Sequence, residues 1–253
     1  RLTARIEREL ESQRKAGYGE ARLAVQPVFS ADGKTVDLRI TAMRGPVVRV
    51  VFTGDTVPAD RRDDLAPVLR EGTTDEDLLE DSSNRIETWF RNQGYRDAAA
   101  PHTRDEKGGE VLITFAVRKG QQYRVDSVDV AGAGELPPAD LQARQRVRAG
   151  QPYSAAALNA DLTQIEDLFR RNGYASAKAE ATTEIRGAGT EAHIPVAIHI
   201  VVTANVRTVV NEVRFEGNAD VADADLRAAV ALGPGSAFST AAVAQDRNAL
   251  ELK

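Results

Sequence analysis

The stretch Arg170–Tyr174 reads RRNGY, and two earlier stretches are similar to it: RNQGY at Arg91–Tyr95 and RKAGY at Arg14–Tyr18. Each begins with arginine and ends with Gly-Tyr, and successive tyrosines lie 77 and 79 residues apart. Such a motif could bind a ligand three times, or it could end a structural unit that is repeated. A fixed period is typical of repeat architectures, which favours the second interpretation.

Two glycines in each period support the repeat. The first follows a run rich in β-branched residues, in the contexts FTGD, VAGA and FEGN, and the second comes 18 residues later, in REGTT, RAGQP and GPGSA. The pairs are Gly54 and Gly72, Gly132 and Gly150, and Gly217 and Gly235. One spacing in three places indicates homologous units of about 78 residues.

Each unit is predicted to start with a strand and a short helix. Apolar residues alternate in the segment before the first glycine, which indicates a half-buried strand. These segments are Val47–Phe52, Arg124–Val130 and Val209–Phe215. A short helix is expected between the two glycines, such as Asp223–Leu232, where Leu226 and Val230 share one face.

The second helix of the unit has the clearest pattern. Four apolar residues recur there at helical spacing and predict a buried stripe: Leu158, Leu162, Ile165 and Phe169. Ser154 is the expected N-cap of this helix. Thr73 and Glu76 form the expected capping box of the equivalent helix one unit earlier.

The Gly-Tyr pair is expected to close this second helix. Glycine suits the left-handed position that ends a helix, and the tyrosine ring can pack back on the last turn. Tyr174 would then cover Phe169 or Leu168. The residues concerned are Gly17 and Tyr18, Gly94 and Tyr95, and Gly173 and Tyr174. The motif is therefore interpreted as structural rather than as a ligand site.

Two strands joined by a glycine-containing turn complete the unit. They are predicted at 96–104 and 111–117, with Gly108-Gly109 between them, and at 176–186 and 194–203, with Gly187-Ala188-Gly189 between them. The third strand is almost wholly apolar, as a central strand is. Pro27 and Pro101 fall within second-strand segments, and sheets tolerate proline mainly at edges.

These elements predict an α+β fold. It is a tandem repeat of small β-α-α-β-β domains, each a three-stranded mixed sheet of order 1-3-2 covered on one face by two helices. Residues 1–46 are the C-terminal part of one domain, 47–123 and 124–208 are complete domains, and 209–253 are the N-terminal part of a further one. Because the chain starts and stops inside helical patterns, we expect it to be a fragment.

Nucleic acid is not an expected partner. The 253 residues carry a net charge of -5 with both signs interspersed, which leaves no basic face. RNA-binding repeats of the KH type also contain β-α-α-β, but they need a GxxG loop between the helices. The loops here read GTTD, GQPY and GSAF, and each lacks the second glycine.

The residues predict neither an enzyme nor a bound cofactor or metal. Cysteine is absent, and the only histidines are His102, His193 and His199; the last two would lie roughly 20 Å apart along a strand. The acidic residues 75–77 open a helix, where negative charge suits the dipole. The glycines of 132–134 and 233–235 lack the further glycine and the lysine of phosphate-binding loops.

A tandem array of open sheet edges suggests a protein-binding scaffold, because an edge strand is a template for an extended peptide. The most complete edge has no proline and alternates small apolar with polar residues: Ser176, Ala177, Lys178, Ala179, Glu180, Ala181, Thr182, Thr183 and Glu184. Two alternatives stay open. Lys178 and Glu180 could merely protect this edge, or short connections such as Gly120–Tyr123 could make the array a rigid spacer.

The pattern resembles the POTRA (polypeptide-transport-associated) domain over essentially the whole chain. The matching stretches are VRFEGN at 213–218 with its counterparts, GQPYS and GSAFS after the first helix, NGY at the end of the second, and VRKGQQY leaving the third strand. MRGP at 43–46 is similar to the same exit from an earlier unit. TANVRT at 203–208 departs from the pattern, since the exit glycine is missing.

The resemblance implies a periplasmic array that precedes an outer-membrane β-barrel in the same chain, as in assembly factors of the BamA and TamA type. Such arrays receive unfolded outer-membrane proteins and dock accessory lipoproteins. Relatives serve two-partner secretion, chloroplast import and bacterial division. Two complete and two partial units favour the assembly-factor branch, and the choice between its BamA-like and TamA-like members stays open.

Overall fold

The computed structural model describes residues 2–132, 136–187 and 192–252. Contacts divide the chain into two compact units, Arg1–Gln121 and Gln122–Lys253, and each is described by itself. The predicted boundaries at 46, 123 and 208 stay predictions. Parts of two expected loops, at 133–134 and 188–189, lie outside the described residues.

The first unit begins with a helix and a hairpin. Helix α1 (Leu2–Lys15) precedes strands β1 (Arg22–Phe29) and β2 (Val36–Met43), which pair antiparallel from Arg22 opposite Met43 to Phe29 opposite Val36. Pro27 lies within β1, opposite Leu38. Most side chains of the hairpin are exposed.

A three-stranded sheet follows in the same unit. Its spatial order is β3 (Val47–Gly54), β5 (Glu110–Val117) and β4 (His102–Lys107), with β3 parallel and β4 antiparallel to β5. Its helices are α2 (Ala59–Leu65), α3 (Val68–Glu71) and α4 (Glu76–Arg91). The core lies between sheet and helices, and its fully buried side chains include Phe115, Leu79 and Ile86.

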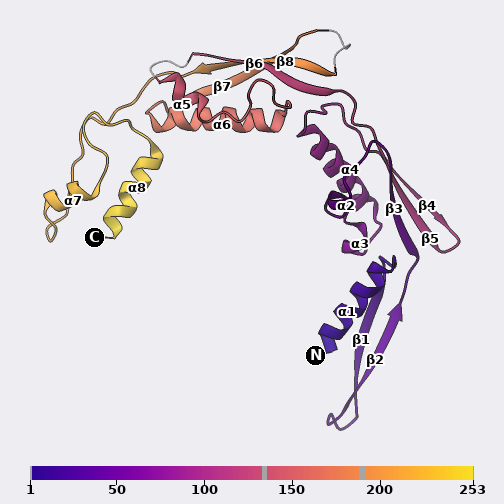
Figure 1. The fold of residues 1–253 in the computed structure, drawn as a ribbon. Coiled ribbons are helices and arrows are strands. Elements are labelled where there is room, and N and C mark those ends of the chain that lie inside the picture. The colour runs from indigo at the N-terminus through magenta and orange to yellow at the C-terminus, as the bar shows by residue number, and fades with distance from the viewer. Residues whose placement is uncertain (1, 133–135, 188–191, 253) are drawn as a thin grey trace. The chain divides into compact units, whose positions relative to one another are not determined.

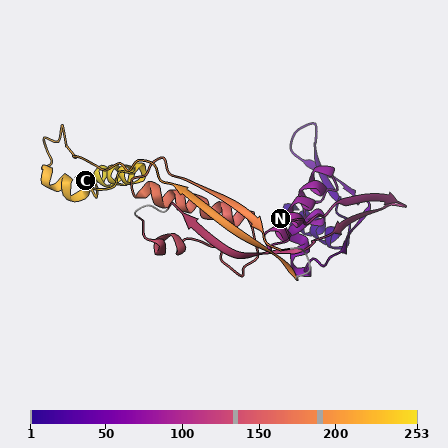
Figure 2. The same cartoon turned by 90° about the horizontal axis from the view of Figure 1, so that it is seen from above.

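The second unit repeats this arrangement. The order is β6 (Gln122–Ala131), β8 (His193–Thr203) and β7 (Lys178–Ile185), again with a parallel and an antiparallel pair. Helices α5 (Pro138–Gln142) and α6 (Ala155–Arg171) lie on one face of the sheet (Figures 1 and 2). Phe169, Ile165 and Ile198 are fully buried between them. The predicted α+β fold, with strand order 1-3-2, is confirmed.

The last part of the chain departs from prediction. Helices α7 (Asp223–Ala229) and α8 (Thr240–Glu251) form, but the strand expected at Val209–Phe215 does not; Val209 makes only an isolated bridge to Ala237. A strand is stabilised by its neighbours in a sheet, and no strand pairs with this segment among the described residues. The alternation of apolar residues in this segment, taken alone, therefore predicted a strand that does not form.

Two local predictions were wrong and one is confirmed. Pro101 directly precedes β4 rather than lying inside it, and its carbonyl accepts a hydrogen bond from the Ala116 N–H (2.9 Å). The N-cap of α4 is Asp75, so Thr73 is outside the helix start and forms no capping box. Ser154 caps α6 as predicted, because its side chain accepts from the Ala157 N–H (3.3 Å).

The end of α6 has the Schellman geometry. Gly173 has φ +93°, its N–H donates to the Arg170 carbonyl (3.2 Å), and the Tyr174 N–H donates to the Phe169 carbonyl (3.0 Å). The Tyr174 ring lies 5.6 Å from that of Phe169, which confirms the expected contact. The same bonds close α4 at Gly94 and Tyr95 and α1 at Gly17 and Tyr18.

The glycine after the first strand of each complete domain is required by a close approach. A Cβ on Gly54 would lie 2.2 Å from the Val117 carbonyl oxygen, and one on Gly132 would lie 2.1 Å from that of Val202. Both carbonyls belong to the end of a central strand. For Gly217, no atom of the described residues lies within 4 Å of such a Cβ, consistent with the absence of a described sheet around it.

Candidate binding edge

Strand β7 forms one edge of the second sheet. Within the described residues it pairs with β8 alone, from Lys178 opposite Thr203 to Ile185 opposite Val196, with no shift of register. The Arg186 N–H donates to the Pro195 carbonyl on β8 (2.9 Å). In an antiparallel pair every second residue directs its N–H and C=O to the partner. The backbone N–H and C=O groups of the even-numbered residues of β7 therefore point to β8. Those of the odd-numbered residues point outward, to the open edge of the sheet.

The side chains of β7 alternate as the sequence predicts. Ala179 is buried and Ala181 half-buried against the helix side, whereas Lys178, Glu180 and Thr182 are exposed. The outward backbone groups belong to Ala179, Ala181, Thr183 and Ile185. The first three of these have small or polar side chains. An approaching backbone would meet little side-chain bulk along this edge.

The predicted edge Ser176–Glu184 is shifted in the structure. Ser176 and Ala177 precede the strand: the Ala177 N–H donates to the Tyr174 carbonyl (3.1 Å), and the Ser176 carbonyl accepts from Asn205 Nδ2 (2.8 Å). The strand itself runs from Lys178 to Ile185. Whether this edge binds a client stays a prediction.

One outward N–H of β7 already has a partner. Glu166, on α6, accepts a hydrogen bond from the Ala179 N–H through Oε1 (3.1 Å). Its other carboxylate oxygen accepts from Arg170, which also binds Asp167. Glu166 is a largely covered side chain, 17% exposed. Sequence reasoning missed it, although a glutamate lies seven residues before the closing glycine in both complete domains.

The equivalent edge strand of the first unit, β4, has the same feature. Ala99 and Arg118 exchange backbone hydrogen bonds (both 2.8 Å), so the alternate residues, such as Ala100, face outward. Glu87 Oε1 accepts from the Ala100 N–H (3.0 Å), and Arg91 donates to Glu87 Oε2 (2.7 Å). We call Glu166 and Glu87 the edge carboxylates.

The three edges differ in their outward groups. The Ser30 N–H faces β2 through its bond to the Thr35 carbonyl (3.0 Å), so Pro27 faces outward on β1 and offers no donor there. Strand β4 reads HTRDEK and is strongly charged. Strand β7 has neither an internal proline nor a run of charges, which leaves it the most accessible of the three to an added strand.

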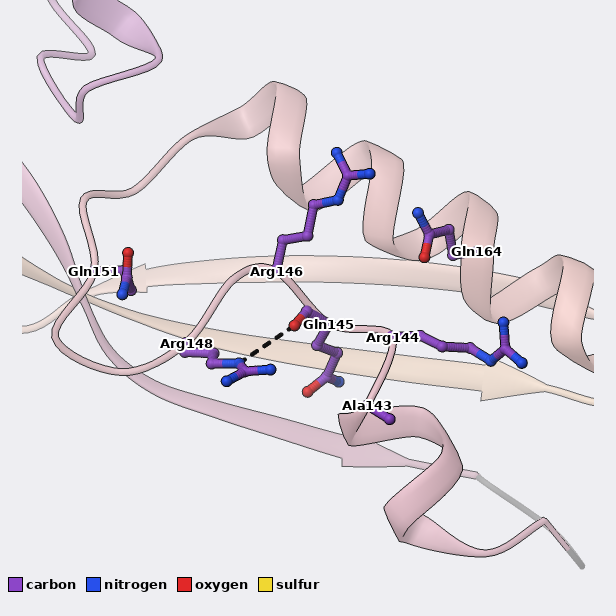
Figure 3. A pocket seen from close by; sticks show the side chains of 7 residues that line it. All are labelled: Ala143, Arg144, Gln145, Arg146, Arg148, Gln151 and Gln164. Carbon is purple, nitrogen blue, oxygen red and sulfur yellow. Dashed lines mark hydrogen bonds between the residues drawn. The ribbon is translucent and has the colours of Figure 1, made fainter.

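A pocket of about 540 Å³ lies beside α6 and is rich in arginine and glutamine (Figure 3). It is lined by Ala143, Arg144, Gln145, Arg146, Arg148, Gln151 and Gln164. The arginine side chains point in different directions, and Arg148 Nε donates to the Gln145 carbonyl (3.4 Å). The donors do not converge on one ligand position, so this surface lacks the geometry of a small-molecule site.

The histidines occupy structural or exposed positions. His102 lies 2.9 Å from Ser83 Oγ and 2.9 Å from Glu76 Oε1, which links β4 to α4. His199, on the exposed face of β8, lies near Asp129 and Glu184. Within the described ranges, no cluster of metal-binding side chains occurs. Among those same residues, no helix is long and apolar enough to cross a membrane.

Known proteins with similar sequences were compared with this chain. The family model POTRA, "Surface antigen variable number repeat", matches residues 123–205 and 208–252. The outer membrane protein assembly factor BamA of Neorickettsia risticii is 23% identical over 238 residues, 87% of this chain and 31% of the relative. BamA of Neisseria meningitidis serogroup B is 22% identical over 254 residues, 93% of this chain and 31% of that protein.

A solved structure of POTRA domains 3–5 of Haemophilus influenzae BamA aligns with a TM-score of 0.49 and 19% identity, covering 82% of this chain and 85% of that one. The chain spans 28% to 31% of the length of the curated relatives that it matches.

Proposed function

Because the chain belongs to the POTRA family, we propose that it is the periplasmic protein-binding array of an outer-membrane protein assembly factor. The names of its relatives support this proposal, since two of them are called outer membrane protein assembly factor BamA. The relatives are about three times as long as this chain, and the proposal assigns an outer-membrane β-barrel to the rest of the protein. Accessory periplasmic or lipoprotein subunits would dock on the same array.

The open edge of β7 is the observation that carries the proposal. Among the described residues, its outward N–H and C=O groups from Ala181 to Ile185 have no sheet partner, and the side chains around them are small or polar except for Ile185. An unfolded outer-membrane protein segment can add there as a further strand. Main-chain pairing would accept many client sequences, as a general assembly factor requires.

A proline at an outward position tests this use of the edge. Thr183 directs its N–H away from β8, so Thr183→Pro removes an outward donor and leaves the β8 ladder intact. We expect the variant to bind a transmembrane-strand peptide of about ten residues from an outer-membrane barrel at least ~10-fold more weakly. Peptide fluorescence anisotropy measures the affinity, and circular dichroism checks the fold.

Arg104→Pro is the matched control, because Arg104 is the corresponding outward residue of β4. It should leave peptide binding to β7 unchanged. Crosslinkers at Lys178 and Thr182 should label the bound peptide in the parent chain. Undiminished binding by Thr183→Pro, with crosslinks only from other surfaces, would rule out this edge.

A rigid spacer is the second candidate, favoured by bonds inside the second unit that hold the segment after β8. The Thr208 N–H donates to the Gly173 carbonyl (2.8 Å), and Arg207 Nε donates to the Asn172 carbonyl (3.1 Å). These contacts fasten the segment after β8 to the end of α6. Small-angle scattering of the chain distinguishes the candidates: a single fixed shape without measurable peptide affinity would favour the spacer.

A further inference from the structure

The edge carboxylates occupy equivalent positions in the two complete domains. Each lies on the long helix, seven residues before the closing glycine, and each accepts from an alanine N–H six residues after that glycine. Each is also held by an arginine one turn later, Arg91 or Arg170. The same construction at two independent places indicates that the contact is a feature of the domain and not of one loop.

The partial domain at the start of the chain lacks this pair. The residue seven positions before Gly17 is Leu10, and the residue six positions after it is Leu23. A leucine side chain cannot accept a hydrogen bond. On that edge the outward Pro27 removes a donor instead. Each of the three edges therefore has one outward position closed to a new backbone, by a proline or by a carboxylate.

The carboxylate stands where an added strand would place its own acceptor. On β7 the outward donors are the N–H groups of Ala179, Ala181, Thr183 and Ile185, and Glu166 already holds the first. A charged acceptor forms a stronger hydrogen bond than a peptide carbonyl does. An incoming strand that accepted from the Ala179 N–H would replace the bond to Glu166 by a weaker bond to a peptide carbonyl. Glu166 Oε1 would then lose its backbone donor.

We infer that the two edge carboxylates are stop residues: Glu87 closes the first outward N–H of the β4 edge and Glu166 that of the β7 edge, and each so fixes where pairing with an added strand begins. On β7 the pairing then starts at Ala181 and covers Ala181, Thr183 and Ile185. On β4 it starts at His102. That the first outward N–H is occupied follows from its hydrogen bond to the carboxylate. That this determines the register of a bound strand rests on the function proposed above.

Amide hydrogen exchange tests the closure without any ligand. In the intact chain the Ala179 amide should exchange more slowly than those of Ala181 and Thr183, for which the described part of the chain supplies no acceptor on this edge. Glu166→Ala should speed exchange at Ala179 about tenfold or more, as expected for loss of a charge-assisted bond. Glu166→Gln keeps an acceptor oxygen and should retain most of the protection.

Asp167→Ala is the matched control for this experiment. Asp167 also binds Arg170 but has no bond to the edge, so its removal should leave Ala179 exchange within about twofold of the parent. Equal exchange at Ala179 and Ala181 in the parent, or no change in Glu166→Ala, overturns the inference.

A bound peptide tests the register. Saturation with the transmembrane-strand peptide should slow exchange at Ala181, Thr183 and Ile185 and leave Ala179 as it was. In Glu166→Ala, added protection should extend to Ala179. Pairing that already includes Ala179 in the parent overturns the register. If the peptide protects none of these amides, edge binding fails as the function, and the ligand-free exchange alone decides whether Glu166 closes the first position.

Discussion

Gly173 meets two requirements that no other residue type satisfies together. Its φ of +93° ends α6, and its backbone lies so close to the segment after β8 that a Cβ would stand 2.5 Å from the Thr208 carbonyl oxygen. Gly17 is comparable, with φ +94° and a carbonyl that accepts from the Val48 N–H (2.7 Å). At Gly17 and Gly173 the Gly-Tyr motif therefore closes a helix and also binds the backbone that follows the last strand of the unit.

The two requirements can be separated by substitution. Gly173→Ala should lower the free energy of unfolding of the second unit by clearly more than Gly150→Ala. Gly150 also has positive φ, +82°, but a Cβ there meets no atom within 4 Å. Its alanine variant should cost about 1 kcal/mol, the left-handed penalty alone. Urea unfolding measures both; equal losses would show that the approach of Thr208 relaxes freely.

At the scale of elements, the sequence predicts a strand best where its neighbours are also predicted. The segments at 47–52, 111–117 and 194–203 lie in three-stranded sheets, and the structure contains each as a strand. The segment 209–215 has the same alternation and no partner strand among the described residues, and it stays irregular. The alternation of apolar and polar residues indicates which face of a strand could be buried. The backbone hydrogen bonds that stabilise the strand come from neighbouring strands of a sheet.

The contacts between helix and edge could not be derived in the same way. Glu166 and Ala179 belong to different elements, and nothing in their local sequence requires them to meet. The repeat offers the one available signal, because Glu87 and Ala100 have the same spacing. A glutamate on a helix is otherwise an ordinary residue in the sequence, so its role becomes visible only through the tertiary contact with the edge strand.

A second contact of this kind fastens α6 to the segment after α5. Asp161, 1% exposed, accepts from the N–H groups of Arg146 (2.8 Å) and Val147 (2.9 Å). Asp161→Ala leaves two covered donors without an acceptor and should lower the free energy of unfolding by roughly 2–4 kcal/mol. Asp161→Asn keeps one acceptor oxygen and should lose less. Chemical denaturation measures this loss. The control is Asp167→Ala, whose side chain is half-exposed and whose stability should lie within about 0.5 kcal/mol of the parent.

Asp246 repeats this contact on α8, where it accepts from the Ala231 and Leu232 N–H groups (both 2.8 Å). Its surroundings are more open than those of Asp161, since no other residue of α8 is buried. Asp246→Ala should therefore destabilise its segment by less than Asp161→Ala destabilises the second sheet domain. A loss of equal size would indicate that the loop contact alone determines the effect.

At the scale of the whole molecule, apolar burial is unevenly distributed. Two core clusters account for the buried apolar side chains around the sheets, one within residues 48–117 and one within 123–202. No described residue of 209–252 belongs to either cluster, and α7 buries nothing. Within the described residues 209–252, the helices therefore have no sheet to cover.

A comparison of helices α6 and α8 shows how much apolar burial contributes to the stability of a helix. Both have a serine N-cap whose side chain accepts a backbone bond, Ser154 from Ala157 (3.3 Å) and Ser239 from Ala242 (3.1 Å). Local capping is thus similar. Helix α6 additionally buries four large apolar side chains: Leu158, Ile165, Leu168 and Phe169.

We expect α8 to open well before α6 as urea is added. Burial of a large apolar side chain contributes about 1.5–3 kcal/mol, and α8 has none among its buried residues. Most of the stability of a helix in a protein comes from such packing rather than from propensity. Native-state hydrogen exchange should therefore show α8 amides exchanging through a low-energy opening, and α6 amides only through unfolding of the sheet domain. If both helices lose protection at the same urea concentration, residues 209–252 are stabilised cooperatively with the second sheet, through contacts such as that of Thr208 with Gly173.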